Sequence, residues 1–240
     1  MPTIIIADDN PRERAFMSQL VETEFDVKTA ANADEALQLI GEDSEPLIIS
    51  DIQMPGLNGI DFAERLWQQT PQARIVFYSH HADEMYIRAL ANIIPPETVY
   101  GYVLKDNNDE TLTRAITAVF NEHQCWIDPK VRPVQARTNR SDTSITDAEY
   151  EVLVDIALGM TDNMIAKRRF LSRRGVQNRL KSLYIKLGIE HDKISDTIDN
   201  EAMNMRARAI SVALRRGLLN VHELNNAEEL FQQWLVERPH

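Results

Sequence analysis

Residues 47–59 read Leu-Ile-Ile-Ser-Asp-Ile-Gln-Met-Pro-Gly-Leu-Asn-Gly. The short β-branched run predicts a buried strand, which ends at Asp51 just before a Met-Pro-Gly turn. A carboxylate at the end of a buried strand costs free energy unless something nearby needs its negative charge. Asp51 is therefore a candidate functional residue, and its partners are expected at the ends of neighbouring strands.

Polar residues also end three other short apolar runs of the sequence. They are Asp8 and Asp9 after residues 3–7, Ser79 after residues 75–78, and Lys105 after residues 102–104. In an open parallel sheet, all of these residues would lie at the carboxyl ends of strands, where such folds bind their ligands.

The segments between these strands have the apolar spacing of amphipathic helices. The predicted helices cover residues 10–21, 32–40, 60–67, 83–91 and 112–120, and a further strand covers residues 27–30. Strands that alternate with helices through short turns predict a doubly wound α/β domain, a (βα)5 unit with a parallel sheet.

Residues 1–127 resemble the receiver domain of two-component response regulators. The motifs that carry the resemblance are Asp8-Asp9, Asp51 with Met54-Pro55-Gly56 and Gly59, Ser79, and Tyr102-Val103-Leu104-Lys105. Each motif is weak alone, but all of them occur in order and at plausible spacing. The resemblance implies a flavodoxin-like sheet with strand order 2-1-3-4-5, in which Asp51 accepts a phosphoryl group from a histidine kinase.

The three carboxylates Asp8, Asp9 and Asp51 would form an oxygen-rich site of the kind that Mg²⁺ prefers. An aspartate attacks a phosphoryl group only where the accumulated negative charge is neutralised. The resemblance implies that Asp9 and the backbone carbonyl of Gln53 bind the ion along with Asp51, while Asp8 acts largely through water.

The resemblance assigns roles to three more residues. Lys105 would pair with a phosphoryl oxygen as a point charge, Ser79 would turn its hydroxyl toward another oxygen, and Tyr102 would swing inward when Ser79 moves. Alternatively, the acidic residues are ordinary turn and cap residues, and Tyr102 is a plain core aromatic. His80 stands where receivers usually have a small residue, and its ring would either narrow the phosphate entrance or point to solvent.

The composition is typical of a soluble globular protein of one or two domains, with 240 residues, 43% of them hydrophobic and 26% charged. No apolar run approaches the roughly 20 residues that span a bilayer, and no signal peptide precedes the first strand. The single cysteine, Cys125, excludes an internal disulfide. These features predict a cytoplasmic protein with no membrane partner.

Charge is divided unevenly along the chain. Residues 1–128 carry a net charge of −14, whereas residues 129–240 carry +3. Between residues 163 and 189 there are eight basic side chains and no acidic one. An acidic first half and a basic segment in the second half indicate two different functions.

The basic segment lies within a series of short helices. Thr146 and Glu149 predict a capping box, Gly159 ends that helix, and Thr161 and Ser172 cap the next two helices. Two short helices joined by a tight turn, the second of them basic, form a helix-turn-helix.

Residues 145–222 resemble the LuxR-type DNA-binding domain of NarL/FixJ response regulators. The matching residues are Thr146, Glu149-Tyr150-Glu151-Val152-Leu153, Ala157, Gly159-Met160-Thr161, Ile165-Ala166, Leu171-Ser172, Val176 and Lys186-Leu187-Gly188-Ile189. The sequence departs from the family at Arg169, where leucine is usual, and at Gly175, where threonine is usual.

In the second helix of this motif, Val176 is at the centre of the predicted buried face. Gln177, Asn178 and Lys181 fall on the opposite side, where they can hydrogen-bond base edges in the major groove, as the resemblance also implies. Basic residues around them are expected to hold phosphates. These are Lys167, Arg173, Arg174, Arg179 and Lys186. The alternative is a basic face that is merely exposed to solvent. The helix dipole disfavours cations in the first turn, where Arg173 and Arg174 lie, so the DNA-binding interpretation is favoured.

Three further segments have their own patterns. Residues 128–144 are polar, contain proline and lack periodicity, so they are expected to form a linker. An acidic insert lies near residues 190–202 of the DNA-binding domain. Residues 223–240 predict an extra helix, capped by Asn225, whose apolar stripe packs either on its own domain or on a second copy.

Together these features predict a transcription factor that is not an enzyme. A sensor histidine kinase would phosphorylate Asp51, and a homodimer would then bind two half-sites of double-stranded DNA. One alternative is an atypical receiver that answers to a partner or ligand instead of phosphate. Another is a phosphohydrolase, which would need an acid two residues after Asp51, where Gln53 stands.

Overall fold

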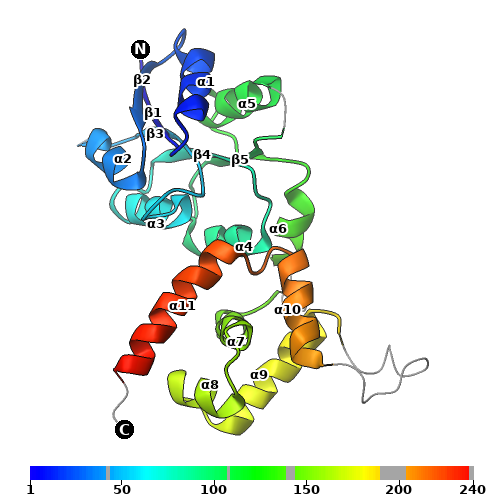
Figure 1. Ribbon diagram of the computed structural model, residues 1–240. Coiled ribbons are helices and arrows are strands. Elements are labelled where there is room, and N and C mark those ends of the chain that lie inside the picture. The colour runs from blue at the N-terminus through cyan, green and yellow to red at the C-terminus, as the bar shows by residue number, and fades with distance from the viewer. Residues whose placement is uncertain (42–43, 107–108, 139–143, 190–203, 238–240) are drawn as a thin grey trace. The chain divides into compact units, whose positions relative to one another are not determined.

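The computed structural model describes residues 1–41, 44–106, 109–138, 144–189 and 204–237. The chain forms two compact units (Figure 1). The first, called the receiver unit here, comprises residues 1–82 and 86–135, and the second, the output unit, comprises residues 83–85 and 136–240. The acidic insert predicted near residues 190–202 lies outside the described residues.

The receiver unit is built on one parallel sheet with the strand order β2-β1-β3-β4-β5-β6. Its strands are β1 (Thr3–Ala7), β2 (Asp26–Ala30), β3 (Leu47–Ser50), β4 (Arg74–Ser79), β5 (Tyr100–Leu104) and β6 (Trp126–Ile127). The predicted order 2-1-3-4-5 is confirmed. The sixth strand was not predicted, because two residues carry no readable periodicity.

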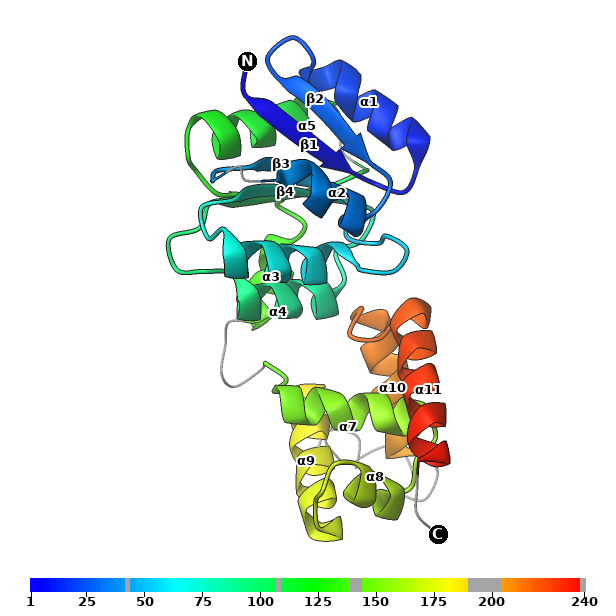
Figure 2. The same ribbon diagram turned by 90° about the vertical axis from the view of Figure 1, so that its left-hand side faces the viewer.

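Helices cover both faces of this sheet (Figure 2). They are α1 (Pro11–Val21), α2 (Ala33–Ile40), α3 (Gly59–Gln69), α4 (Glu84–Ile93) and α5 (Asp109–Ile116), which continues into a π-helical turn (Thr117–Asn121). A short helix, α6 (Arg132–Thr138), follows β6. Met17 of α1 and Leu112 of α5 pack with Ile4, Ile49 and Val76 in one buried cluster, so α1 and α5 share a face. The (βα)5 prediction is confirmed for this unit.

Asparagine caps begin the helices that follow β1 and β3. Asn10 accepts a hydrogen bond from the Arg12 amide, and Asn58 accepts from the amides of Ile60 and Asp61. These side chains satisfy amide donors that have no partner within the helix. Both helices therefore start at a defined distance from the strand ends that carry the acidic residues.

The output unit is helical in its described part. Its helices are α7 (Asp147–Ala157), α8 (Asp162–Arg168), α9 (Arg173–Lys186), α10 (Met205–Arg215) and α11 (Val221–Val236). The capping box of Thr146 and Glu149 is present. Val152, Ile165, Val176 and Leu183 are fully buried in the shared core, which confirms the buried position predicted for Val176.

Helix α11 begins earlier than predicted. Its cap is Asn220, whose side chain accepts from the Glu223 amide at 2.9 Å, so Asn225 lies within the helix and the predicted start was wrong. Phe231 is buried in the core of the output unit and stacks on Trp234, with ring centroids 6.1 Å apart. Packing of the stripe on its own unit is therefore observed for these two rings, while Leu230 remains exposed.

Candidate functional site

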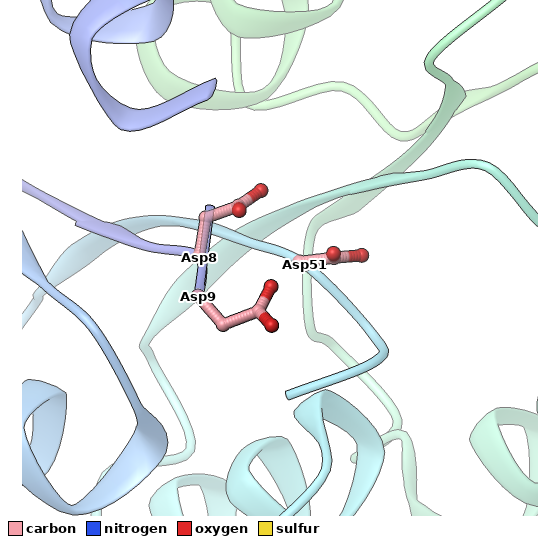
Figure 3. A group of neighbouring side chains, drawn as sticks. All are labelled: Asp8, Asp9 and Asp51. Atoms are coloured by element: carbon pink, nitrogen blue, oxygen red, sulfur yellow. The ribbon is translucent and has the colours of Figure 1, made fainter. Parts of the chain in front are cut away.

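Strand ends bring three carboxylates together at one edge of the receiver sheet. Ala7 of β1 and Ser50 of β3 are paired in register, so the residues that follow them, Asp8 and Asp51, leave adjacent strands side by side. Carboxylate oxygens of Asp8, Asp9 and Asp51 lie within 4.8 Å of one another and point to the same side (Figure 3). Asp8 and Asp51 are buried, whereas Asp9 is exposed.

Lys105 supplies the positive charge of this cluster. Its Nζ lies 2.6 Å from Asp8 Oδ2 and 3.1 Å from Asp51 Oδ2, and its side chain is only 3% exposed. Burial by itself would lower the pKa of Lys105, but the charges of Asp51 and Asp8 outweigh it and raise that pKa. Burial raises the pKa of Asp8 despite its bond to Lys105. The lysine is therefore held as a cation between two carboxylates.

The Asp51 carboxylate is held in a fixed orientation. Its Oδ1 accepts from the Ile52 amide at 2.6 Å and from the more distant Gln53 amide at 3.4 Å. The loop that follows is tight, because the Gly59 amide bonds to the Ile52 carbonyl at 2.8 Å. A Cβ on Gly59 would lie 2.1 Å from the Asp51 carbonyl oxygen, so only glycine fits there.

The two remaining predicted receiver residues lie along the next strands. Ser79 is buried, and its Oγ is 3.3 Å from the His81 amide. Tyr102 is 1% exposed, and its hydroxyl donates to the His81 carbonyl at 2.7 Å, so it already faces inward. Its ring also packs near Phe77, with centroids 6.2 Å apart, so it is a core aromatic as well. His80 is exposed.

Two residues at this site were missed by the sequence analysis. The Tyr78 ring lies 5.6 Å from Lys105 Nζ, and burial with nearby acidic residues raises the pKa of Tyr78 to about 12. Arg14 donates from Nη1 to the Asp8 carbonyl at 2.6 Å. Tyr78 was hidden inside an apolar strand, and Arg14 lies one helical turn beyond the Asn10 cap, so neither forms a motif.

In the output unit, the faces of α9 are those that the spacing predicts. Val176, Leu180 and Leu183 are buried. The residues expected to read bases are exposed, namely Gln177, Asn178 and Lys181, and so are the expected phosphate contacts Lys167, Arg173 and Arg174. Arg179 is half-buried. Polar side chains and the arginines of the first turn therefore share one accessible side of α9, while Lys167 is exposed on α8.

Lys186 does not belong to that accessible side. Its Nζ lies 2.7 Å from Glu149 Oε2, and Glu149 is itself buried and accepts from the Ser182 hydroxyl at 2.6 Å. The predicted phosphate contact is corrected on this ground, because the ammonium group already neutralises a buried carboxylate. The pair joins the capping box of α7 to the end of α9.

This pair should make the stability of the output unit depend on pH. Burial alone would raise the pKa of Glu149, but bonds from Lys186, Ser182 and Thr146 outweigh it and lower that pKa. A lowered pKa adds stability above the unfolded value, and that stability is lost as pH falls through the folded value. Glu149→Gln should cost about 2 kcal/mol near neutral pH, and its difference from wild type should shrink in acid. Calorimetry of the whole chain checks this; a pH-independent difference would contradict it.

Arg169, the departure from the LuxR pattern, has a buried partner. Asp155 is fully buried and accepts from Arg169 Nε at 2.8 Å and Nη2 at 3.1 Å. Arg168 Nη1 donates to the same carboxylate at 2.9 Å. An ion-pair cluster thus fastens the end of α8 to α7 where the family usually has leucine at the arginine position.

Residues 4–117 match the family model of the response regulator receiver domain. The chain is 26% identical to the transcriptional regulatory protein YdfI of Bacillus subtilis (strain 168), over 92% of this chain and 99% of that protein. It is 28% identical to the nitrate/nitrite response regulator protein NarL of Escherichia coli (strain K12), over 78% of this chain and 90% of that protein.

Solved structures show the same fold. A structure of the two-component response regulator RcsB–DNA complex has a TM-score of 0.57 at 22% identity, covering 88% of this chain and 98% of that one. A structure of RcsB from Salmonella typhimurium has a TM-score of 0.56 at 22% identity, over 80% and 96% of the two chains. Within the described residues, no helix has the length and apolar character needed to cross a membrane. Residues 4–117, which contain the acidic cluster around Asp51, thus match the response regulator receiver domain, and the chain as a whole is similar to response regulators of the NarL/FixJ type.

Proposed function

We propose that this protein is a DNA-binding transcription regulator that a sensor histidine kinase controls by phosphorylating Asp51. One observation carries the proposal: Asp51 lies beside two further carboxylates and 3.1 Å from the buried ammonium of Lys105. If Asp8 and Asp51 were only turn or cap residues, they would not need to share a buried lysine. A phosphoryl acceptor does need one, because charge accumulates on the phosphoryl oxygens.

The donor atoms fit a divalent metal ion. Carboxylate oxygens from Asp8, Asp9 and Asp51 are hard ligands close enough to share one ion, and the Gln53 carbonyl follows Asp51 in the same loop. Bound Mg²⁺ would neutralise charge on the phosphoryl group during transfer. Because Asp9 is exposed, the metal site would be open on that side to water and to the phosphoryl donor.

The phosphoryl transfer itself would use the side chains of Asp51, Lys105 and Ser79. An Asp51 carboxylate oxygen attacks phosphorus, the bond from phosphorus to the kinase histidine nitrogen breaks, and that nitrogen keeps the bonding pair. Lys105 exchanges one of its carboxylate contacts for a phosphoryl oxygen. The Ser79 hydroxyl, which lies near the His81 amide in this structure, can donate a hydrogen bond to a second phosphoryl oxygen. Phosphorylation adds about −1.5 to −2 charges, which rearranges these contacts.

Asp51→Asn tests the proposal directly. With acetyl phosphate and Mg²⁺, the wild-type protein should form an acid-stable, base-labile adduct, seen by mass spectrometry, and the variant should form none. Asp61→Asn is a matched control, because that aspartate lies in the first turn of α3 and belongs neither to the cluster of three carboxylates nor to the ion pairs of Lys105. Equal labelling of wild type and Asp51→Asn would refute the proposal.

DNA binding rests on the accessible side of α9. We infer that a dimer presents two such helices to half-sites about one or two helical turns apart. Lys181→Ala should cost about 1–3 kcal/mol at one base position and relax specificity there, whereas Arg173→Ala should weaken all sequences alike and make the salt dependence shallower. Selection from random DNA, followed by salt titrations, separates the two effects. A uniform loss in both variants would contradict this division of roles.

The alternatives gain no support from the site. His80 is exposed, so its ring provides no observation that favours a receiver without phosphorylation. Gln53 donates from its amide to the Tyr86 hydroxyl at 3.1 Å and cannot act as the general acid of a phosphohydrolase.

A further inference from the structure

The unpredicted strand β6 lies beside β5, the strand that carries Tyr102. Gly101 and Tyr102 of β5 pair with Trp126 and Ile127 of β6, and the Asp128 amide donates to the Tyr102 carbonyl at 2.9 Å. The backbone of Tyr102 is therefore bonded to the stretch of chain that leads onward to the output unit.

The side chain of Asp128 joins the two ends of this arrangement. It is 1% exposed, and its Oδ2 lies 3.4 Å from the amide of Leu104, the residue before Lys105. Its Oδ1 accepts from the Lys130 amide at 2.8 Å, and its carbonyl accepts from the amides of Val131 and Arg132. One buried carboxylate thus bridges the end of β5 and the turn that starts α6.

Other contacts hold the same segment along β5. Val131 is buried, the Gln135 amide donates to the Tyr100 hydroxyl at 3.1 Å, and Lys130 forms an ion pair with Asp106, which follows Lys105. The stretch expected to be the start of a linker is thus bonded to residues 100–106. A flexible linker exposed to solvent would not bury the carboxylate of Asp128 or the side chain of Val131.

We propose that Asp128 is a positioning residue of the phosphorylation site, and that β6 passes the state of that site to the segment preceding the output unit. The inference rests on the proposed phosphorylation of Asp51. In the structure, β6 is paired with the backbone of Tyr102 while the side chain of Tyr102 faces inward, so the two arrangements occur together. The proposal is that they are coupled, so that a change favouring the inward side chain also favours the pairing of β6. Phosphorylation, which pulls Ser79 and Lys105 toward the new oxygens, is expected to act in that direction.

Thermodynamic linkage makes the proposal testable from both ends. If occupation of the phosphorylation site strengthens β6, then weakening β6 must weaken occupation by the same factor. Beryllofluoride with Mg²⁺ is a suitable probe, because it binds reversibly where a phosphoryl group would be attached. Its binding measures an equilibrium, to which the reciprocity applies.

The first measurement uses the unsubstituted full chain. Hydrogen exchange of the amides in residues 126–131 should slow at least threefold when beryllofluoride and Mg²⁺ are added. The second measurement compares beryllofluoride affinity in variants. Asp128→Ala should bind at least threefold more weakly, and Asp128→Asn, which keeps an acceptor oxygen, should recover part of the loss. Asp26→Ala, an exposed aspartate on the opposite edge strand β2, should bind as wild type does.

The outcomes separate this inference from the proposed function. If wild type bound no beryllofluoride and Asp51 accepted no phosphoryl group, the proposed function would fail first. If wild type bound the probe while exchange in residues 126–131 stayed unchanged, or while Asp128→Ala kept full affinity, the inference alone would be overturned. If Asp128→Ala does not fold, the beryllofluoride affinity of Asp128→Asn and the hydrogen exchange of the wild-type chain still test the inference.

Discussion

Lys105→Met should slow phosphorylation of Asp51 by acetyl phosphate by about 10²–10³-fold, the usual effect of removing one preorganised donor to developing charge. The ammonium is 3% exposed and lies within 3.1 Å of both buried carboxylates, so no water-exposed lysine can take its place. Methionine keeps the length and apolar stem of the side chain. The loss should therefore come from the charge and not from packing.

The measurement is a time course of the aspartyl phosphate at fixed acetyl phosphate and Mg²⁺. Lys28→Met is the matched control, because Lys28 is an exposed lysine on β2 of the same sheet. Circular dichroism establishes that both variants fold. A Lys105→Met rate within threefold of wild type would show that this cation does not stabilise the transfer.

Asp155→Ala should lower the free energy of unfolding of the output unit by about 3 kcal/mol. Removing one partner of a buried ion pair typically costs about 3–5 kcal/mol. The lower end applies because Arg168 and Arg169 are 12% and 22% exposed and can turn partly toward water. Glu151→Ala is the control: its carboxylate also pairs with Arg169 but is 50% exposed, so its loss should cost less than about 1 kcal/mol.

A double substitution distinguishes the charge from the packing. Asp155→Leu combined with Arg169→Leu puts an apolar pair in place of the Asp155–Arg169 ion pair, and such replacements are often neutral or stabilising. Of the two arginines, only Arg168 then loses its carboxylate partner. The double variant should therefore be more stable than Asp155→Ala in calorimetry of the whole chain. If both were equally destabilised, the site would depend on the shape of the ion-pair cluster and not on an unpaired charge.

Much of the receiver site could be predicted from sequence because its signals are local. Each apolar run ends in a polar residue within one or two positions, and the ends of parallel strands meet at one edge by the geometry of the sheet. Asp8, Asp9, Asp51 and Lys105 therefore came together as expected. The buried face of α9 followed in the same way from its period.

The tertiary structure decided those features that depend on which distant residue is the partner. Lys186 has a basic side chain like its neighbours on α9, but the buried carboxylate of Glu149, far away in sequence, draws it away from the accessible face. Asn220 and Asn225 can both cap a helix, and only the helix as folded, with Phe231 in the core, shows that Asn220 does so. Strand β6 has too few residues for a pattern, and it forms because β5 offers an edge and Asp128 a bridge to Leu104. A sequence by itself determines local propensity and spacing, whereas the choice among partners requires the distances that exist only after the chain has folded.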